Sequence, residues 1–304
     1  MIRKLEMNQP PVVLVRRAGE GKAKTVDEEA ERQRRIEAIF GELDALIGLD
    51  GIKKLAREIQ AFLVMQERRR AASLLVEPLV LHMVFVGNPG TGKTTVARLF
   101  GRLFNAMGVL PKGHLIEAER ADLVGEYIGH TAQKTREVVR KALGGVLFID
   151  EAYSLARGGE KDFGKEAIDT LVKAMEDYKD QLIMILAGYR REMNLFLLTN
   201  PGLKSRFPIH VDFPDFSAQE LLRIALLMLR RREYHLSPGA RQKLVEILED
   251  QLEAGDPHFG NARFVRNLME KAIRRQAVRL VDKPNLTRAD LMTITEADLE
   301  VPET

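Results

Sequence analysis

The chain of 304 residues is long enough for one large domain and a smaller one. Its 47 basic residues nearly balance its 44 acidic ones, so the net charge of +3 does not demand a nucleic-acid partner, and the lack of cysteine excludes disulfides and thiolate metal sites. No apolar run approaches the roughly 20 residues of a membrane span, and the charged N-terminus does not fit a signal peptide. We therefore expect a cytoplasmic protein without a membrane partner.

Residues 1–24 contain two adjacent prolines, scattered basic residues and one short apolar run, and we interpret them as a flexible N-terminal arm. A capping-box pattern at residues 25–28 predicts a helix that begins near Val26. After a break at residues 46–48, apolar residues at helical spacing predict an amphipathic helix over residues 51–75.

Apolar runs then alternate with helical patterns, which is typical of a parallel α/β sheet. Five runs are expected to be strands, at residues 81–86, 115–118, 146–149, 182–187 and 209–213. After residue 214 the alternation stops and only helical patterns follow. The predicted fold is therefore a five-stranded parallel sheet between helices over residues 25–214, followed by a separate helical domain over residues 215–304.

The run G-N-P-G-T-G-K-T at residues 87–94 fits the eight-position phosphate-loop pattern completely and directly follows the first predicted strand. Lys93 is expected to reach the β and γ phosphates of a nucleoside triphosphate, and the Thr94 hydroxyl to ligate Mg²⁺. A glycine-rich turn without a ligand is disfavoured because every fixed position is filled. The residues expected to contact the nucleotide here are Gly87, Asn88, Pro89, Gly90, Thr91, Gly92, Lys93, Thr94 and Thr95.

Two carboxylates, Asp150 and Glu151, directly follow the predicted strand at residues 146–149. A parallel strand delivers its end to the same sheet edge as the phosphate loop. Asp150 is therefore expected to hold Mg²⁺ through its water shell, and Glu151 to polarise the water that attacks the γ phosphate. The alternative is a strand end that simply carries solvated acids, and the intact phosphate loop disfavours it.

The phosphate loop, the acidic strand end and the trailing helical bundle together resemble the AAA+ ATPases, from about Leu43 to the C-terminus. The resemblance implies a phosphate-loop ATPase fold with a C-terminal all-α lid, Mg²⁺-dependent ATP hydrolysis and assembly into a ring, expected to be a hexamer. In such proteins an arginine near the end of the α/β domain inserts into the neighbouring subunit's site, and Arg206 in N-P-G-L-K-S-R-F matches it.

Further positions follow from the same resemblance. A lid arginine that touches the γ phosphate within one subunit matches Arg263 in G-N-A-R, and the element beside the adenine matches Ile47 and Gly48. Arg266 lies on nearly the same helix face as Arg263, where a structural ion pair is an alternative. Most family members end the fourth strand with Asn or Thr, whereas this chain reads I-L-A-G-Y, so Tyr189 is the candidate for the first sensor although its reach differs.

Tyr127 and Ile128 lie between glycines in a predicted exposed loop after the second strand. Exposed apolar side chains usually signal contact with something, and packing back on the domain is the alternative. In AAA+ remodelling enzymes this is the place of the central-pore loop, so the resemblance implies that both side chains grip a threaded polypeptide. A charged, glycine-rich loop at residues 156–164 fits either a second channel loop or a segment without function.

The sequences of four motifs resemble those of the CbbX/CfxQ/SpoVK branch of the AAA+ ATPases. These motifs are G-N-P-G-T-G-K-T-T-V-A-R, F-I-D-E-A-Y-S-L, I-L-A-G-Y and N-P-G-L-K-S-R-F. The arm and the first predicted helix look more like the sporulation members of that branch. The expected function is the remodelling or threading of a protein client, in sporulation. The alternatives are a CbbX-type red Rubisco activase and, from another class, a DNA-directed loader, while a non-hydrolysing switch conflicts with the presence of Glu151.

Overall fold

The computed structural model describes residues 26–76, 79–127, 129–157, 162–199 and 201–300. The expected arm at residues 1–24 and the candidate loop residue Ile128 lie outside the described residues. No helix in the described ranges is long and apolar enough to cross a membrane.

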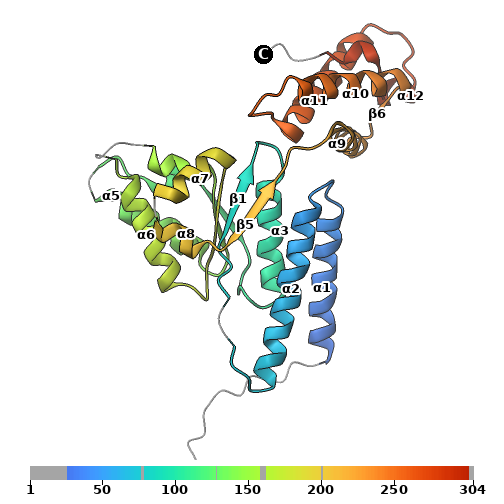
Figure 1. Ribbon diagram of the computed structural model, residues 1–304. Helices are drawn as coiled ribbons and strands as arrows, with labels where there is room; N and C mark the ends of the chain where they lie inside the picture. Colours follow the sequence, from blue (N-terminus) through green and yellow to red (C-terminus); the bar gives the residue numbers. More distant parts are fainter. Residues whose placement is uncertain (1–25, 77–78, 128, 158–161, 200, 301–304) are drawn as a thin grey trace, which may run out of the picture.

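The centre of the larger domain is the predicted five-stranded parallel sheet, with the strand order β2-β3-β4-β1-β5 (Figure 1). The middle strands β1, β3 and β4 are buried along their whole length, as expected of continuous apolar runs covered on both faces. The edge strands β2 and β5 are partly exposed. The bounds are β1 Met83–Gly87, β2 Leu115–Ala118, β3 Val146–Ile149, β4 Ile183–Gly188 and β5 Ile209–Phe213.

Helices cover both faces of this sheet, and alternate strand residues supply the two cores. Met83 and Phe85 of β1 pack toward α1 (Val26–Asp44), α2 (Asp50–Ala71) and α3 (Lys93–Ala106). Val84 and Val86 face the other side, where the helices are α4 (Arg120–Leu123), α5 (His130–Ala142), α6 (Gly164–Asp177), α7 (Arg190–Thr199) and α8 (Pro201–Arg206). The parallel α/β prediction is thus confirmed.

The C-terminal domain is the predicted helical lid. Its helices are α9 (Ala218–Arg230), α10 (Pro238–Glu253), α11 (Asn261–Leu280) and α12 (Arg288–Met292). Two of these helices are capped by serine side chains, since Ser217 forms a capping box with Glu220 and Ser237 accepts a hydrogen bond from the Ala240 N–H. The lid also contains a short parallel pair, β6 (His235–Leu236) and β7 (Thr293–Ile294), which helical periodicity did not predict.

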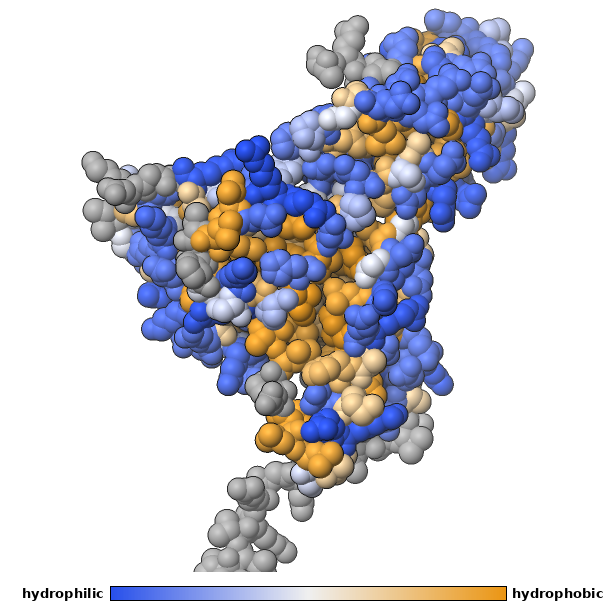
Figure 2. Space-filling model, viewed as in Figure 1, coloured by the Kyte–Doolittle hydropathy of each residue, from blue (hydrophilic) through white to orange (hydrophobic). Residues whose placement is uncertain are grey.

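Some elements differ from the sequence prediction. The segment between the fourth and fifth strands, left without an element, forms α7 and α8. The second predicted helix ends at Ala71 instead of Leu75, whose side chain is exposed. Figure 2 shows apolar surface gathered on the larger domain, on the face where β5 lies, whereas polar side chains cover most of the lid in that view.

Candidate nucleotide-binding site

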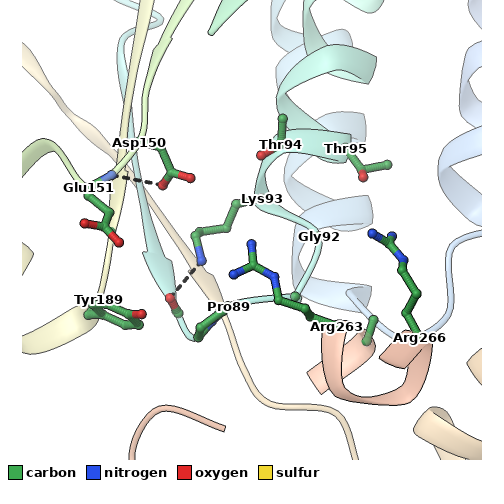
Figure 3. A pocket seen from close by; sticks show the side chains of 14 residues that line it. Pro89, Gly92, Lys93, Thr94, Thr95, Asp150, Glu151, Tyr189, Arg263 and Arg266 are labelled. Atoms are coloured by element: carbon green, nitrogen blue, oxygen red, sulfur yellow. Dashed lines mark hydrogen bonds between the residues drawn. The ribbon is translucent and has the colours of Figure 1, made fainter. Parts of the chain in front are cut away.

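A cavity of about 280 Å³ lies at the carboxyl ends of β1, β3 and β4, where α11 of the lid approaches the sheet domain (Figure 3). It brings together most of the residues that the sequence predicted for the site. Its lining residues are Gly87, Pro89, Gly90, Gly92, Lys93, Thr94, Thr95, Asp150, Glu151, Gly188, Tyr189, Ala262, Arg263 and Arg266.

The phosphate loop turns directly into α3, whose N-terminus therefore faces this cavity. Gly90 and Gly92 have φ angles of 72° and 100°, the left-handed region that side-chain-bearing residues rarely adopt. The Lys93 ammonium donates hydrogen bonds to the carbonyls of Gly87, at 2.9 Å, and Asn88, at 2.8 Å. Burial lowers the pKa of Lys93, while the nearby Asp150 carboxylate opposes that shift. A helix N-terminus beside a lysine is an arrangement that binds phosphate.

The oxygen ligands at the site suit Mg²⁺. Thr94 offers a hydroxyl and Asp150 a carboxylate, and both line the cavity (Figure 3). In the described part of the chain, no group of three or more histidines, aspartates or glutamates could hold a metal by itself. Mg²⁺ commonly uses one or two protein oxygens together with waters and substrate phosphates, and these residues fit that pattern.

Glu151 occupies a strained position at the end of β3. Its φ of 44° and ψ of 43° lie in the left-handed region, which is costly for a glutamate. The residue turns the chain from β3 into a 3₁₀ helix, Ala152–Ala156, and its carboxylate faces the same cavity as Lys93. Such strain is concentrated at functional sites, which is consistent with a constrained catalytic role.

Tyr189 follows β4 and lies on the same side of the cavity as Glu151 (Figure 3). Its ring makes an edge contact with the lid residue His258, at 4.8 Å between centroids, and lies 6.0 Å from the ring of Tyr153. Burial and then the Glu151 carboxylate raise the pKa of Tyr189, so its hydroxyl stays protonated at neutral pH and can donate a hydrogen bond. The cluster of Tyr153, Tyr189 and His258 was not predicted from the sequence.

The lid reaches the cavity through the start of α11. Arg263 and Arg266 both point into it from that helix (Figure 3). Within the described ranges neither arginine forms an ion pair, so the structural alternative for Arg266 finds no partner there. The Ala262 N–H donates to the Gly90 carbonyl at 3.3 Å, and a Cβ on Gly90 would lie 2.3 Å from the Gly260 carbonyl oxygen. Only glycine permits this close contact between lid and phosphate loop.

A second cavity, of about 440 Å³, adjoins the first and shares Gly90, Gly92, Thr95 and Ala262 with it. Its walls are largely apolar and suit an aromatic base. Ile47 and Thr91 lie in this wall, and the apolar side chains around them are Leu46, Leu49, Leu99, Phe216, Ile224 and Leu227. Two expected nucleotide contacts line neither cavity. Gly48 lies against Glu220, and the Asn88 side chain points to Asp215.

Arg206 and Tyr127 lie away from the nucleotide cavity. Arg206, at the end of α8, pairs with Glu176 of α6 and donates to the Gly202 carbonyl at 2.9 Å. It lines a different cavity, beside His82. The Tyr127 side chain is 66% exposed, and its ring makes an edge contact with the ring of His130, at 5.5 Å between centroids.

Two family models match the chain, the ATPase family associated with various cellular activities (AAA) over residues 83–215 and the AAA lid domain over residues 217–304. The chain is 58% identical over 269 residues to stage V sporulation protein K of Bacillus subtilis, covering 88% of this chain and 84% of that protein. It is 46% identical over 272 residues to the chloroplastic ribulose bisphosphate carboxylase/oxygenase activase of Cyanidioschyzon merolae, covering 88% and 92% of the two chains.

Solved structures share the fold at low sequence identity. The AAA domain of FIGL-1 superposes with a TM-score of 0.57 at 18% identity, covering 84% of this chain and 80% of that chain. A RuvB variant of Thermotoga maritima gives a TM-score of 0.53 at 18% identity, covering 84% and 69%. The matched domains, the phosphate loop and the lid identify the chain as an ATP hydrolase of the AAA family, in the branch that contains stage V sporulation protein K and the CfxQ and CbxX proteins.

Proposed function

We propose that this chain assembles into a hexameric ring in the cytoplasm and couples Mg²⁺-dependent ATP hydrolysis to the remodelling or threading of a protein client. The observation that carries the proposal is the separation of Arg206 from the nucleotide cavity of its own chain, where the other predicted catalytic residues meet. A finger arginine on a different surface requires a second subunit, so assembly becomes part of catalysis.

Nucleotide binding rests on three side chains in this proposal. The Lys93 ammonium contacts the β and γ phosphates, at the positively polarised N-terminus of α3. Thr94 and Asp150 hold Mg²⁺, which supplies charge neutralisation to the phosphoryl group that is transferred. The apolar second cavity beside Ile47 receives the base, which is consistent with its apolar lining.

Hydrolysis requires a base, an orienting group and positive charge. Glu151 takes the proton of the attacking water, and the neighbouring Tyr189 hydroxyl orients that water. Arg263 contacts the γ phosphate from within the subunit, and the neighbouring subunit's copy of Arg206 adds the second positive charge. These roles agree with the cavity position of Glu151, Tyr189 and Arg263.

The client contact is assigned to Tyr127. An aromatic side chain that is 66% exposed on a loop has apolar surface available for a polypeptide. Movement of the lid and of the subunit interface during hydrolysis would shift this loop and pull on the client. Ile128, the second expected contact, keeps that role as a prediction from the sequence.

The biological setting has two candidates, because relatives of both kinds align along nearly the whole chain. The higher identity to stage V sporulation protein K favours a sporulation role. The similarity to a Rubisco activase favours a Rubisco client, and ATPase measurements with and without ribulose bisphosphate distinguish the two. A DNA-directed role would instead give DNA binding that weakens steeply with salt, whereas the balanced charge supports a protein client.

A subunit-mixing experiment tests the shared site. Glu151→Gln subunits lack the base but donate Arg206, and Arg206→Ala subunits keep the base but donate no finger. Each variant alone should be nearly inactive, while a 1:1 mixture should restore about a quarter of the sites in a ring. Recovery on mixing supports catalysis across the interface. No recovery, with mixed rings demonstrated by tagged subunits, would overturn the trans role of Arg206.

A further inference from the structure

Asn261, the first residue of α11, is completely buried between the lid and the sheet domain. Its amide oxygen accepts a hydrogen bond from the Phe216 N–H at 2.9 Å. Its amide nitrogen donates to an Asp215 carboxylate oxygen at 2.7 Å and to the Phe259 carbonyl at 3.0 Å. Both amide hydrogens and the amide oxygen are therefore used. The φ of 47° also suits asparagine, which tolerates the left-handed region better than most residues.

Asp215 connects this amide to the phosphate loop. It lies in the short segment between β5 and α9, which is the covalent link between the two domains. One of its carboxylate oxygens accepts from Asn261, and the other accepts from the side-chain amide of Asn88 at 2.9 Å. Asn88 belongs to the phosphate loop, and its carbonyl accepts from the Lys93 ammonium. One carboxylate thus joins the loop, the interdomain link and the lid.

These contacts fix the distance between Lys93 and Arg263, which both act on the γ phosphate in the proposed mechanism. Lys93 is held at one end of the chain of hydrogen bonds, and Arg263 follows Asn261 by only two residues at the other end. Backbone contact between Gly90 and Ala262 brings the same two segments together. A small rotation of the lid about the interdomain link would move Arg263 away from Lys93, and misplacement by about 1 Å costs catalysis heavily.

We propose that Asp215 and Asn261 are positioning residues that hold the lid in register with the phosphate loop and thereby place Arg263 in the active site. They act through Arg263 and do not touch the substrate. The role of Arg263 itself belongs to the proposed function, on which this inference rests. Asn88 completes the connection on the side of the phosphate loop.

Exchange of the two side chains tests the connection without changing their size. Asn261→Asp sets two carboxylates against each other, and Asp215→Asn leaves two amide donors competing for one oxygen. In the double variant, the amide at position 215 donates to the carboxylate at position 261 and still accepts from Asn88, but the Phe259 carbonyl loses its donor. We expect each single variant to lower ATP turnover about 10-fold or more and the double variant to recover part of that loss, because only the contact between positions 215 and 261 is restored. Asn267→Asp, an exposed change on the same helix, should have no effect.

Lid position is measured separately from turnover. The chain has no cysteine, so Lys173→Cys on α6 and Glu249→Cys on α10, both exposed, can be spin-labelled specifically. With labelled subunits diluted among unlabelled ones, wild type should give one narrow distance distribution. Asn261→Asp should broaden it, and the double variant should narrow it again. This readout requires no hydrolysis, so it remains informative if the proposed ATPase mechanism fails.

Two results would overturn the inference. One is a distance distribution that stays as narrow in Asn261→Asp as in wild type. The other is a double variant that folds, binds a fluorescent ATP analogue, and is no more active than the single variants. Failure of wild type to hydrolyse ATP, with the distances behaving as expected, would instead count against the proposed function.

Discussion

The Asp150 carboxylate accepts a hydrogen bond from the backbone N–H of Glu151 at 3.0 Å, and the two adjacent side chains point to different parts of the cavity (Figure 3). The left-handed backbone of Glu151 keeps both side chains at the cavity, because in an extended strand the following side chain would turn to the other face of the sheet. Two consecutive carboxylates can thus serve one nucleotide site in separate roles, one near Thr94 and the other near Tyr189.

Glu151→Gln should reduce turnover by about 100-fold or more, because the amide cannot accept the proton of the attacking water. Binding of a fluorescent ATP analogue should persist, since Lys93 and Thr94 are unchanged. The neighbouring change Asp150→Asn provides the contrast, and it should raise the Mg²⁺ concentration needed for half-maximal turnover. Wild-type turnover in Glu151→Gln would remove that residue from the role of base.

Arg206→Ala should retain nucleotide binding and lose turnover by about 1,000-fold, the usual contribution of an arginine finger. Turnover of wild type should also rise with protein concentration, since the finger of the proposed ring comes from a neighbour. Lys204→Ala, an exposed basic residue on the same helix, is the matched control and should remain active. Loss of nucleotide binding in Arg206→Ala, measured by fluorescence titration, would contradict a role restricted to the transition state.

Sequence reasoning predicted the parallel sheet and the core of the site because both depend on contiguous signals. The apolar run before residue 87 and the run before Asp150 each specify a buried strand, and parallel strands end at one edge. Lys93 and Asp150 were therefore expected in one place, where the structure has them.

What the sequence did not predict depends on contacts between distant segments. Asp215 and Asn261 are 46 residues apart, and no spacing rule joins an acid after a strand to an amide at the start of a helix. The segment that forms α7 and α8 contains a proline at the start of α8 and only short apolar runs, so the sequence alone gives a weak helical pattern. Its helices become evident only in the structure, where Met193 and Phe196 are buried against the sheet.

His82 should make the protein less stable in mild acid. Its side chain is 5% exposed, its Nδ1 accepts the Met184 N–H at 3.0 Å, and burial lowers its pKa from 6.5 to about 4. The unfolded chain takes up a proton below pH 6.5 while the folded one does not until about pH 4, so stability falls as the pH drops through that window. Between pH 7 and pH 5 the loss should be about 2 kcal/mol.

The variant His82→Asn isolates this contribution, because its amide oxygen can accept the same N–H and does not titrate. Urea unfolding of wild type and variant at both pH values gives the comparison. Carboxyl groups titrate in both proteins, so the difference between them reports His82. An equal loss of stability in the two proteins would exclude the histidine as the cause.

Tyr189→Phe should lower turnover about 10-fold and leave nucleotide affinity unchanged, because it removes only the hydroxyl that we propose to orient water. The ring contact with His258 is kept, so a structural effect on the lid is avoided. Since burial and the Glu151 carboxylate raise the pKa of Tyr189, the wild-type hydroxyl stays protonated around neutral pH and should add no step to the pH–turnover profile there. Steady-state kinetics across pH provide the check, and unchanged turnover would leave the first sensor unassigned.

Tyr127→Ala should separate ATP hydrolysis from capture and remodelling of the client. The side chain is 66% exposed and lies outside the nucleotide cavity, so ATP turnover should stay within about threefold of wild type. Capture of a client by the Glu151→Gln ring should be lost when Tyr127→Ala is added, because the aromatic contact is absent. Tyr127→Phe should capture the client normally. Leu291→Ala, an exposed apolar change in the lid, is the control for nonspecific binding to apolar surface. Remodelling of the captured client at wild-type rate by Tyr127→Ala would rule out threading by this loop residue.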